Sequence, residues 1–329
     1  RDTRHGRYLK AGPAAQPKGS NDAVAISADP DPDIGDDGPL VVLTSRQSAS
    51  ASEIFAAALQ DYGRAVIVGD KSTFGKGTVQ TILEIGRFTS LLGSRSSEDG
   101  ALKLTIQKFY RIAGGSTQLH GVASDIVLPT LTDLPEYGEG ALKNALPYDE
   151  VPPARFTKWS DSHQLFIDEL KARSAARVTA DPEFHYVMED MERLRKKLDD
   201  NRITLNEDVR RKELGEEKVR KETRTKDRLA RNMEEPNIYR LTLETIDDPK
   251  LQLIMYPGKT AEAKKKGGDV AKVAPEAAPG ADDSDDSSDL DSTDDSKPAA
   301  VDAERDETLN ILGDLVQLTN GPKTASTAR

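Results

Sequence analysis

Two short apolar runs, separated by a helical pattern, dominate the first third of the chain. Leu40 to Leu43 and Ala65 to Val68 are continuous apolar stretches, typical of strands that are buried on both faces. Between them, apolar residues recur at helical spacing from Ser52 to Tyr62, and Gly63 follows as a helix-ending residue. A strand, a helix and a strand within about 30 residues predict a parallel crossover unit.

Further strands are predicted after this unit. Thr78 to Leu83 and Leu102 to Ile112 have strand-like patterns, and apolar residues alternate with polar ones in the second, as in a half-exposed strand. Ile126 to Leu128 is a third, short candidate. The expected fold class of this part is therefore α/β.

The C-terminal half has a different pattern. Asp181 followed by Pro182 is a typical helix start, with apolar residues recurring on one face beyond it. Residues 205–233 are dominated by Lys, Arg and Glu, so we expect an exposed helix that is weakly held. Asp306 to Leu318 has an apolar stripe of Leu309, Leu312, Leu315 and Val316. A helix this short is not stable alone in water, so it is predicted to dock on another part of the protein.

Low-complexity segments complete the division of the chain. A run dense in Asp and Ser repels itself and has nothing to bury, which predicts disorder. The patterns divide the chain into a polar loop or insert at 1–38, a compact part at 39–131, a proline-rich linker at 132–158, a helical domain at 159–256, a disordered acidic linker at 257–302, a terminal amphipathic helix at 303–319 and a tail at 320–329.

Composition excludes several classes of function. The net charge of -11 argues against nucleic acid as a partner, because phosphate binding needs clustered positive charge. Cysteine is absent, which excludes disulfides, thiolate metal sites and a cysteine nucleophile. The histidines show no metal-ligand spacing, and the acidic residues near Asp31 lack the glycine and glutamate of a calcium-binding loop. No metal or cofactor is expected.

The most informative residues lie where the two buried strands end. Ser48, Ser50 and Ser52 follow the first strand, and Lys76 follows the second between two glycines. Alone, the serines indicate a helix cap and the lysine a solvated loop. Together they indicate a site, because parallel strands place their carboxyl ends at one edge of a sheet. A neutral lysine can take the proton of a serine, and a helix N-terminus can stabilise an oxyanion. The combination predicts a serine–lysine hydrolase.

These residues belong to motifs that resemble those of the carboxyl-terminal processing proteases, peptidase family S41, and within them the tail-specific branch. The motifs are SASASEIFAAA at 48–58, QDYGRA at 60–65, TFGKGTVQ at 73–80, TIQKFYR at 105–111, GGSTQ at 114–118, NALP at 144–147, DPEF at 181–184 and DETLNI at 306–311. The resemblance implies a protease core of the ClpP/crotonase type, incomplete at its N-terminus, followed by a mostly α-helical C-terminal domain.

The resemblance also implies roles for five residues. Ser50 matches the family's nucleophile and Lys76 its general base, which together make a Ser–Lys dyad. Asp61 matches an acidic residue on the helix after the serine, and Gln80 matches a glutamine that supports the orientation of the lysine. The backbone N–H of Ala51 would be one oxyanion donor.

What the family does gives further expectations. The resemblance implies a serine endopeptidase that processes or degrades proteins recognised by apolar C-terminal tails. It would lie in the bacterial periplasm, or at the inner membrane facing the periplasm, with an adaptor lipoprotein as a candidate partner. The family carries a PDZ domain and the first half of the protease fold upstream, including a glycine that donates the second oxyanion N–H. None of these is present here, so the isolated chain is expected to be inactive.

Two other interpretations stay open. The chain could be a catalytically inactive fragment that keeps the site residues, or a helical scaffold that binds an adaptor. Ser124 also stands where the family usually has proline, and the loop before Thr73 is one residue longer than the family pattern.

Overall fold

The computed structural model describes residues 12–19, 23–29, 36–85, 100–134, 136–159, 163–231, 238–240, 252–254 and 301–320. The chain divides into two compact units, one made of residues 1–202 with 302–329 and the other of residues 203–301. Nearly all of the acidic linker predicted at 257–302, and the tail after residue 320, lie outside the described residues.

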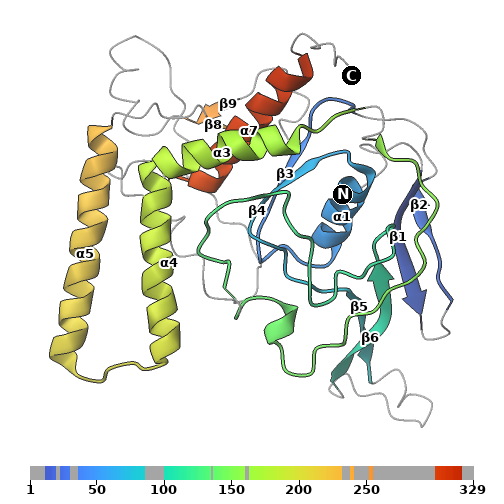
Figure 1. Ribbon diagram of the computed structural model, residues 1–329. Helices are drawn as coiled ribbons and strands as arrows, with labels where there is room; N and C mark the ends of the chain where they lie inside the picture. Colours follow the sequence, from blue (N-terminus) through green and yellow to red (C-terminus); the bar gives the residue numbers. More distant parts are fainter. Residues whose placement is uncertain are drawn as a thin grey trace. The chain divides into compact units, whose positions relative to one another are not determined.

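A three-stranded parallel sheet lies in the first unit (Figure 1). Its strands are β3 (Val41–Thr44), β4 (Val66–Gly69) and β7 (Ile126–Val127), in the order β3-β4-β7. Helix α1 (Ala51–Tyr62) connects β3 to β4, and the two strands pair in parallel. The crossover unit expected from the apolar pattern is therefore present, with strand bounds shifted by one residue.

Helices cover both faces of this sheet. On one face, Ile67 of β4 packs against α1. On the other face, Val66 and Val68 pack against α3 (Ile167–Ala180) and α7 (Ala303–Asn320), which lie side by side. All four residues of β4 are buried, as the apolar run predicts for a strand between two helical layers.

A four-stranded antiparallel sheet lies beside the parallel one. It has the order β2-β1-β6-β5, with β1 (Gly12–Gly19), β2 (Ser27–Asp29), β5 (Thr78–Glu84) and β6 (Ala101–Tyr110). The polar loop predicted for 1–38 is therefore wrong over β1 and β2. The segment has two prolines and few large apolar residues, and its strand state comes from pairing with β6, about ninety residues away in the chain.

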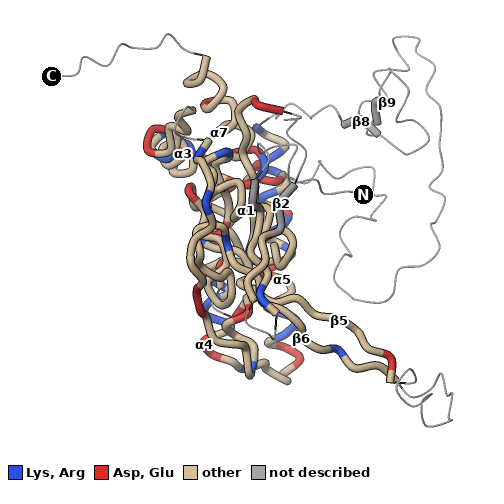
Figure 2. The backbone as a smooth tube through the Cα atoms, turned by 90° about the vertical axis from the view of Figure 1, so that its right-hand side faces the viewer, with Lys and Arg blue, Asp and Glu red and all other residues tan. Residues whose placement is uncertain are grey.

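The hairpin of β5 and β6 extends away from α1 and α3 (Figure 2). Sequence alternation predicts one buried face for β6, yet its first seven residues are all exposed. Leu102 and Ile106 are about half exposed, and Ile82 of β5 is 68% exposed. The alternating pattern thus identifies the strand correctly but not a partner that covers its apolar face.

The segment expected to be a linker at 132–158 packs on the chain between β6 and β7. The N–H of Val151 donates to the carbonyl of Gly114 at 2.9 Å, and the N–H of Ala154 donates to the carbonyl of Ile112 at 2.9 Å. A short 3-10 helix, η3 (Glu139–Ala141), lies within it. The prolines prevent regular structure but not packing, so the linker interpretation is corrected over its described residues.

The helix signals after residue 158 correspond to observed helices. Helix α4 (Pro182–Asp200) begins at the predicted position, where the carboxylate of Asp181 accepts from the N–H of Glu183 at 2.8 Å. Phe184 anchors its first turn, because it is buried in the cluster that includes Leu170 of α3.

Helix α7 docks on α3 and the sheet, on a face that matches the predicted apolar stripe only in part. Its buried apolar residues are Ile311 and Leu315, whereas Leu309 is 59% exposed. Arg177 of α3 explains this rotation. Its guanidinium donates to Glu307, four residues before Ile311, and to Asp314, one residue before Leu315. The ion pairs thus fix which side of α7 faces α3.

Docking of α7 should weaken as pH rises towards neutrality. Burial, together with the carboxylates of Asp70 and Asp302, raises the pKa of Glu304 from 4.5 to about 7. Such a carboxyl stabilises the folded state when protonated, so its contribution is full below about pH 4.5 and is lost between there and pH 7. We expect Glu304→Gln to raise the free energy of unfolding by about 2 kcal/mol at pH 8 relative to wild type, and by much less at pH 4.5.

Urea unfolding of wild type and Glu304→Gln at the two pH values checks this. If the free energy of unfolding changed equally with pH in the two proteins, Glu304 would not titrate near neutrality. Asp306→Asn is the matched control, because Asp306 lies on the same helix and forms an exposed pair with Arg305.

In the second unit the structure describes one helix and two short strands. Helix α5 (Glu207–Ala230) is capped by Asn206, whose side chain accepts from the N–H groups of Asp208 and Val209. None of its residues is buried, and pairs such as Arg211 with Glu207 lie along its surface. Strands β8 (Ile238–Arg240) and β9 (Gln252–Ile254) pair in antiparallel fashion. In neither unit is any described helix both long and apolar enough to cross a membrane.

Candidate active site

Ser50 lies at the point where the chain turns from β3 into α1. It is the N-cap of α1 and has φ of 56° and ψ of -108°, a backbone conformation that side-chain-bearing residues rarely adopt. Residues in such conformations persist only where neighbouring contacts hold them, and they cluster at functional sites. The strain here marks Ser50 as a residue whose position is enforced.

The N–H of Ala51 points out of the first turn of the same helix. None of the described residues accepts a hydrogen bond from this N–H. The N-terminus of a helix carries a partial positive charge, so a free N–H there can stabilise a negative oxygen. The structure thus leaves the expected oxyanion donor available next to Ser50.

Glu53 joins the serine to the lysine loop. Its carboxylate is fully buried and accepts four hydrogen bonds. Oε2 accepts from the N–H groups of Ser50 at 2.8 Å and Lys76 at 2.9 Å, while Oε1 accepts from the N–H of Gly75 and the hydroxyl of Thr73, both at 2.6 Å. Because one oxygen binds both N–H groups, the backbones of Ser50 and Lys76 are held within a few ångströms of each other.

The four donors do not fully offset the burial of this carboxylate. Burial raises the pKa of Glu53, and the hydrogen bonds from Thr73, Gly75, Ser50 and Lys76 oppose that shift. The motifs do not mark Glu53 as a site residue, but a signal for it is present. A serine followed three residues later by glutamate is the capping-box pattern, which predicts contact of that carboxylate with the N–H of the serine.

Lys76 lies on the loop that connects β4 to β5. Its ammonium donates to the carbonyl of Thr78 at 3.0 Å. The carbonyl of Lys76 accepts from the hydroxyl of Thr117 at 3.4 Å. The loop also contacts the serine turn directly, since the N–H of Phe74 donates to the carbonyl of Ser48 at 3.0 Å. The structure therefore brings the loops of Ser50 and Lys76 together.

Asp70 and Arg46 form a second link between the two loops. The carboxylate of Asp70 is fully buried and accepts from the N–H of Arg46 and the hydroxyls of Thr130 and Thr132. The guanidinium of Arg46 donates in turn to the carbonyl of Thr73 at 3.0 Å. The positions of both loops are thus determined by buried polar contacts.

Asp61 and Gln80 do not join this cluster. Asp61 is near the other end of α1, about 16 Å from Ser50 at the rise of an α-helix. Its carboxylate is paired with the guanidinium of Arg111 and accepts from Nε of that residue at 3.1 Å. Gln80 is exposed on β5 and donates to the hydroxyl of Thr105 at 3.5 Å. In this structure Asp61 stabilises the end of the helix, and Gln80 contacts the neighbouring strand.

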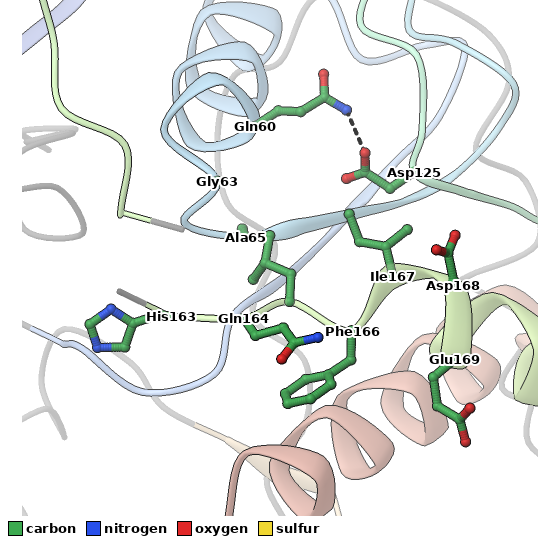
Figure 3. A pocket seen from close by; sticks show the side chains of 11 residues that line it. Gln60, Gly63, Ala65, Asp125, His163, Gln164, Phe166, Ile167, Asp168 and Glu169 are labelled. Carbon is green, nitrogen blue, oxygen red and sulfur yellow. Dashed lines mark hydrogen bonds between the residues drawn. The ribbon is translucent and has the colours of Figure 1, made fainter. Parts of the chain in front are cut away.

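A cavity of about 870 Å³ lies at the end of α1 away from Ser50 (Figure 3). Gln60 of α1 and Asp125, just before β7, line one side of it, and Phe166 and Glu169 line it from the start of α3. The carboxylate of Asp125 accepts from Gln60 at 3.0 Å and from the N–H of Ile67, so it is occupied by structural contacts. Neither Ser50 nor Lys76 lines this cavity. In the described part of the chain, no cluster of His, Asp and Glu has the arrangement of a metal site.

Comparison with known protein families identifies the family of this chain. Residues 7–128 match the family described as peptidase family S41, and residues 132–317 match the C-terminal domain of tail specific protease. The chain belongs to the tail-specific protease family. The predicted family and the α/β core with a helical C-terminal part are thereby confirmed, and the boundary between the two matches falls just after β7.

Individual relatives agree with this assignment. A tail-specific protease of Haemophilus influenzae is 38% identical over 218 residues, which are 66% of this chain and 31% of that protein. A carboxy-terminal-processing protease of Bartonella bacilliformis is 45% identical over 108 residues, or 33% of this chain and 22% of that protein. The chain thus spans less than a third of the length of either relative.

A solved structure has a weaker likeness. The photosystem II D1 C-terminal processing protease is 31% identical over 37% of this chain and 29% of its own, with a TM-score of 0.31.

Proposed function

We propose that this chain carries the nucleophile and the general base of a serine endopeptidase, Ser50 and Lys76. The observation that supports this most is the buried carboxylate of Glu53, which binds the N–H groups of both residues through a single oxygen.

The proposed chemistry begins with Lys76 in its neutral form. Rotation of its side chain away from the carbonyl of Thr78 would bring the amine to the hydroxyl of Ser50. The amine takes the hydroxyl proton as the serine oxygen bonds to the carbonyl carbon of the substrate. The carbonyl oxygen becomes negative and accepts from the N–H of Ala51. The lysine ammonium then gives its proton to the departing amine, the peptide bond breaks, and an ester to Ser50 remains.

Water completes the reaction by the same route. The neutral lysine removes a proton from water, the resulting oxygen bonds to the ester carbon, and the proton returns to Ser50 as the ester bond breaks. Every proton passes between Lys76, Ser50, water and substrate, so the proposed steps need no cofactor.

The substrate class and location are part of the same proposal. The relatives are named for tail-specific and carboxy-terminal processing, so we propose proteins with apolar C-terminal tails as substrates, in the bacterial periplasm or at the inner membrane facing it. An adaptor lipoprotein is the proposed partner that presents them. The roles of Asp61 and Gln80 would then be indirect, through the end of α1 and through β5.

A fluorophosphonate probe that reacts with activated serines tests the proposal on the full gene product. Mass spectrometry of the digested protein should find the probe on Ser50 and not on Ser48 or Ser52. A peptide with an apolar C-terminus should slow the labelling, whereas the same peptide with an acidic C-terminus should not. Labelling of Ser48 or Ser52 instead of Ser50 in a protein that cleaves the peptide would refute the assignment. A protein that neither takes the probe nor cleaves the peptide would favour the scaffold interpretation.

A further inference from the structure

Gln118 is a fully buried amide whose side chain spans two segments. Its Oε1 accepts from the N–H of Gly77 at 2.8 Å. Its Nε2 donates to Oε1 of Glu139 at 3.2 Å and to the carbonyl of Leu146 at 3.0 Å. Both hydrogens of the amide group and its oxygen thus have partners, one in the lysine loop and two in the segment that contains η3.

Residues 117–119 run along the lysine loop and hold it at successive positions. The N–H of Leu119 donates to the carbonyl of Gly75 at 2.8 Å, and Thr117 donates to the carbonyl of Lys76. A Cβ at Gly77 would lie 2.8 Å from the nitrogen of Gln118, so the two backbones approach as closely as glycine allows. These contacts, together with the hydrogen bond from the N–H of Lys76 to Glu53, hold the backbone of the lysine loop on both sides of Lys76.

The segment that contains η3 contacts the same loop from its other side. The N–H of Glu139 donates to the carbonyl of Phe74 at 2.8 Å, and a Cβ at Gly138 would meet that carbonyl oxygen at 3.0 Å. This segment lies within the part of the chain that matches the C-terminal domain of tail specific protease. The C-terminal match therefore reaches the lysine loop directly at Phe74 and through Gln118 at Gly77.

We propose that Gln118 and Glu139 are positioning residues for Lys76, through which the 138–146 segment determines whether the general base can reach Ser50. The inference rests on the proposed function. In the structure the ammonium donates to the carbonyl of Thr78, so catalysis requires the amine to leave this carbonyl and reach the hydroxyl of Ser50, from which it accepts. A long flexible side chain reaches the serine only if its backbone is oriented correctly, and a displacement of about 1 Å at a catalytic group can reduce the rate about 10²-fold.

Gln118→Met tests this in the full gene product, because it keeps the length of the side chain and removes its hydrogen bonds. We expect kcat to fall about 10²-fold with KM within about threefold of wild type, since Gln118 is fully buried. Tyr110→Phe is the matched control. It removes a part-buried hydrogen bond of 3.0 Å to Asp149, which lies outside the 138–146 segment but within the same C-terminal match. We expect it to keep kcat.

A reciprocal exchange covers the case in which Gln118→Met does not fold. In Gln118→Glu the new carboxylate faces that of Glu139, and kcat should fall at least about tenfold, because an unpaired buried charge disrupts the site. Adding Glu139→Gln restores a donor and acceptor pair with the roles exchanged, and should recover most of that loss. A merely structural role would make the loss and recovery of kcat follow the free energy of unfolding of the same variants, and that result would refute the positioning role.

The outcomes separate this inference from the proposed function. Two results would refute the positioning role and leave the dyad in place, provided that Ser50→Ala is inactive. In the first, Gln118→Met keeps the kcat of wild type. In the second, kcat falls as much in Tyr110→Phe as in Gln118→Met. A failure of Glu139→Gln to rescue Gln118→Glu also refutes it. If Ser50→Ala is as active as wild type, the proposed function itself fails.

Discussion

Replacing Ser50 by alanine is expected to abolish peptide cleavage by the full gene product while leaving its stability unchanged. The loss in kcat should be on the order of 10⁶-fold, as for removal of the nucleophile from other serine proteases. Stability should change little, because alanine keeps the N–H that donates to the buried carboxylate of Glu53. The strained backbone is equally unfavourable for alanine and serine.

Cleavage of a peptide with an apolar C-terminus, followed by urea unfolding of the same samples, measures both halves of the expectation. Ser52→Ala is the matched control, because Ser52 is an exposed serine on the first turn of the same helix. It should keep full activity. Activity that survives in Ser50→Ala and disappears in Ser52→Ala would move the nucleophile to the other serine.

Local patterns predict the part of the fold that depends on local interactions. The apolar run of β4 and the helical spacing of α1 are properties of adjacent residues, and both elements form where those patterns lie. By contrast, β1 is a strand through pairing with β2 and with β6, and β6 is about ninety residues away in the chain. The segment at 132–158 likewise packs through backbone bonds to Gly114 and Ile112. Neither interaction can be predicted from the composition of the segment itself.

The rotation of α7 shows a second limit of the same kind. Periodicity predicts the helix, but its leucines occupy more than one face, so the partner surface selects which are buried. Arg177 makes that selection by binding Glu307 and Asp314, from a helix about 130 residues earlier in the chain. Ion pairs at that separation cannot be assigned from sequence spacing.

The site divides along similar lines. Ser50 and Lys76 follow from the motifs, and the structure brings their loops together. Glu53 was detectable as a capping residue of Ser50, but its bonds to the lysine loop depend on how two loops meet. Asp61 illustrates the opposite case. A position on the same helix as the nucleophile is no evidence of proximity, because that helix is long enough to place the carboxylate next to Arg111 instead.

Lys76→Arg should inactivate the enzyme even though it preserves the positive charge. Arginine keeps its proton under all conditions relevant to proteins, so it cannot accept one from the hydroxyl of Ser50. It can still donate to the carbonyl of Thr78, which is the contact that lysine makes in the structure. We therefore expect normal stability and a loss in kcat of at least about 10²-fold, the lower end for removal of a general base.

The matched control is Lys71→Arg, because Lys71 is an exposed lysine earlier on the same loop. It should keep its activity. Chemical rescue then distinguishes a base from a purely electrostatic role. In Lys76→Ala, a small primary amine added to the solution should restore part of kcat, and more so as the pH rises and the neutral amine becomes more abundant. An arginine variant that cleaves at the wild-type rate would show that the positive charge of Lys76 matters and its proton transfer does not.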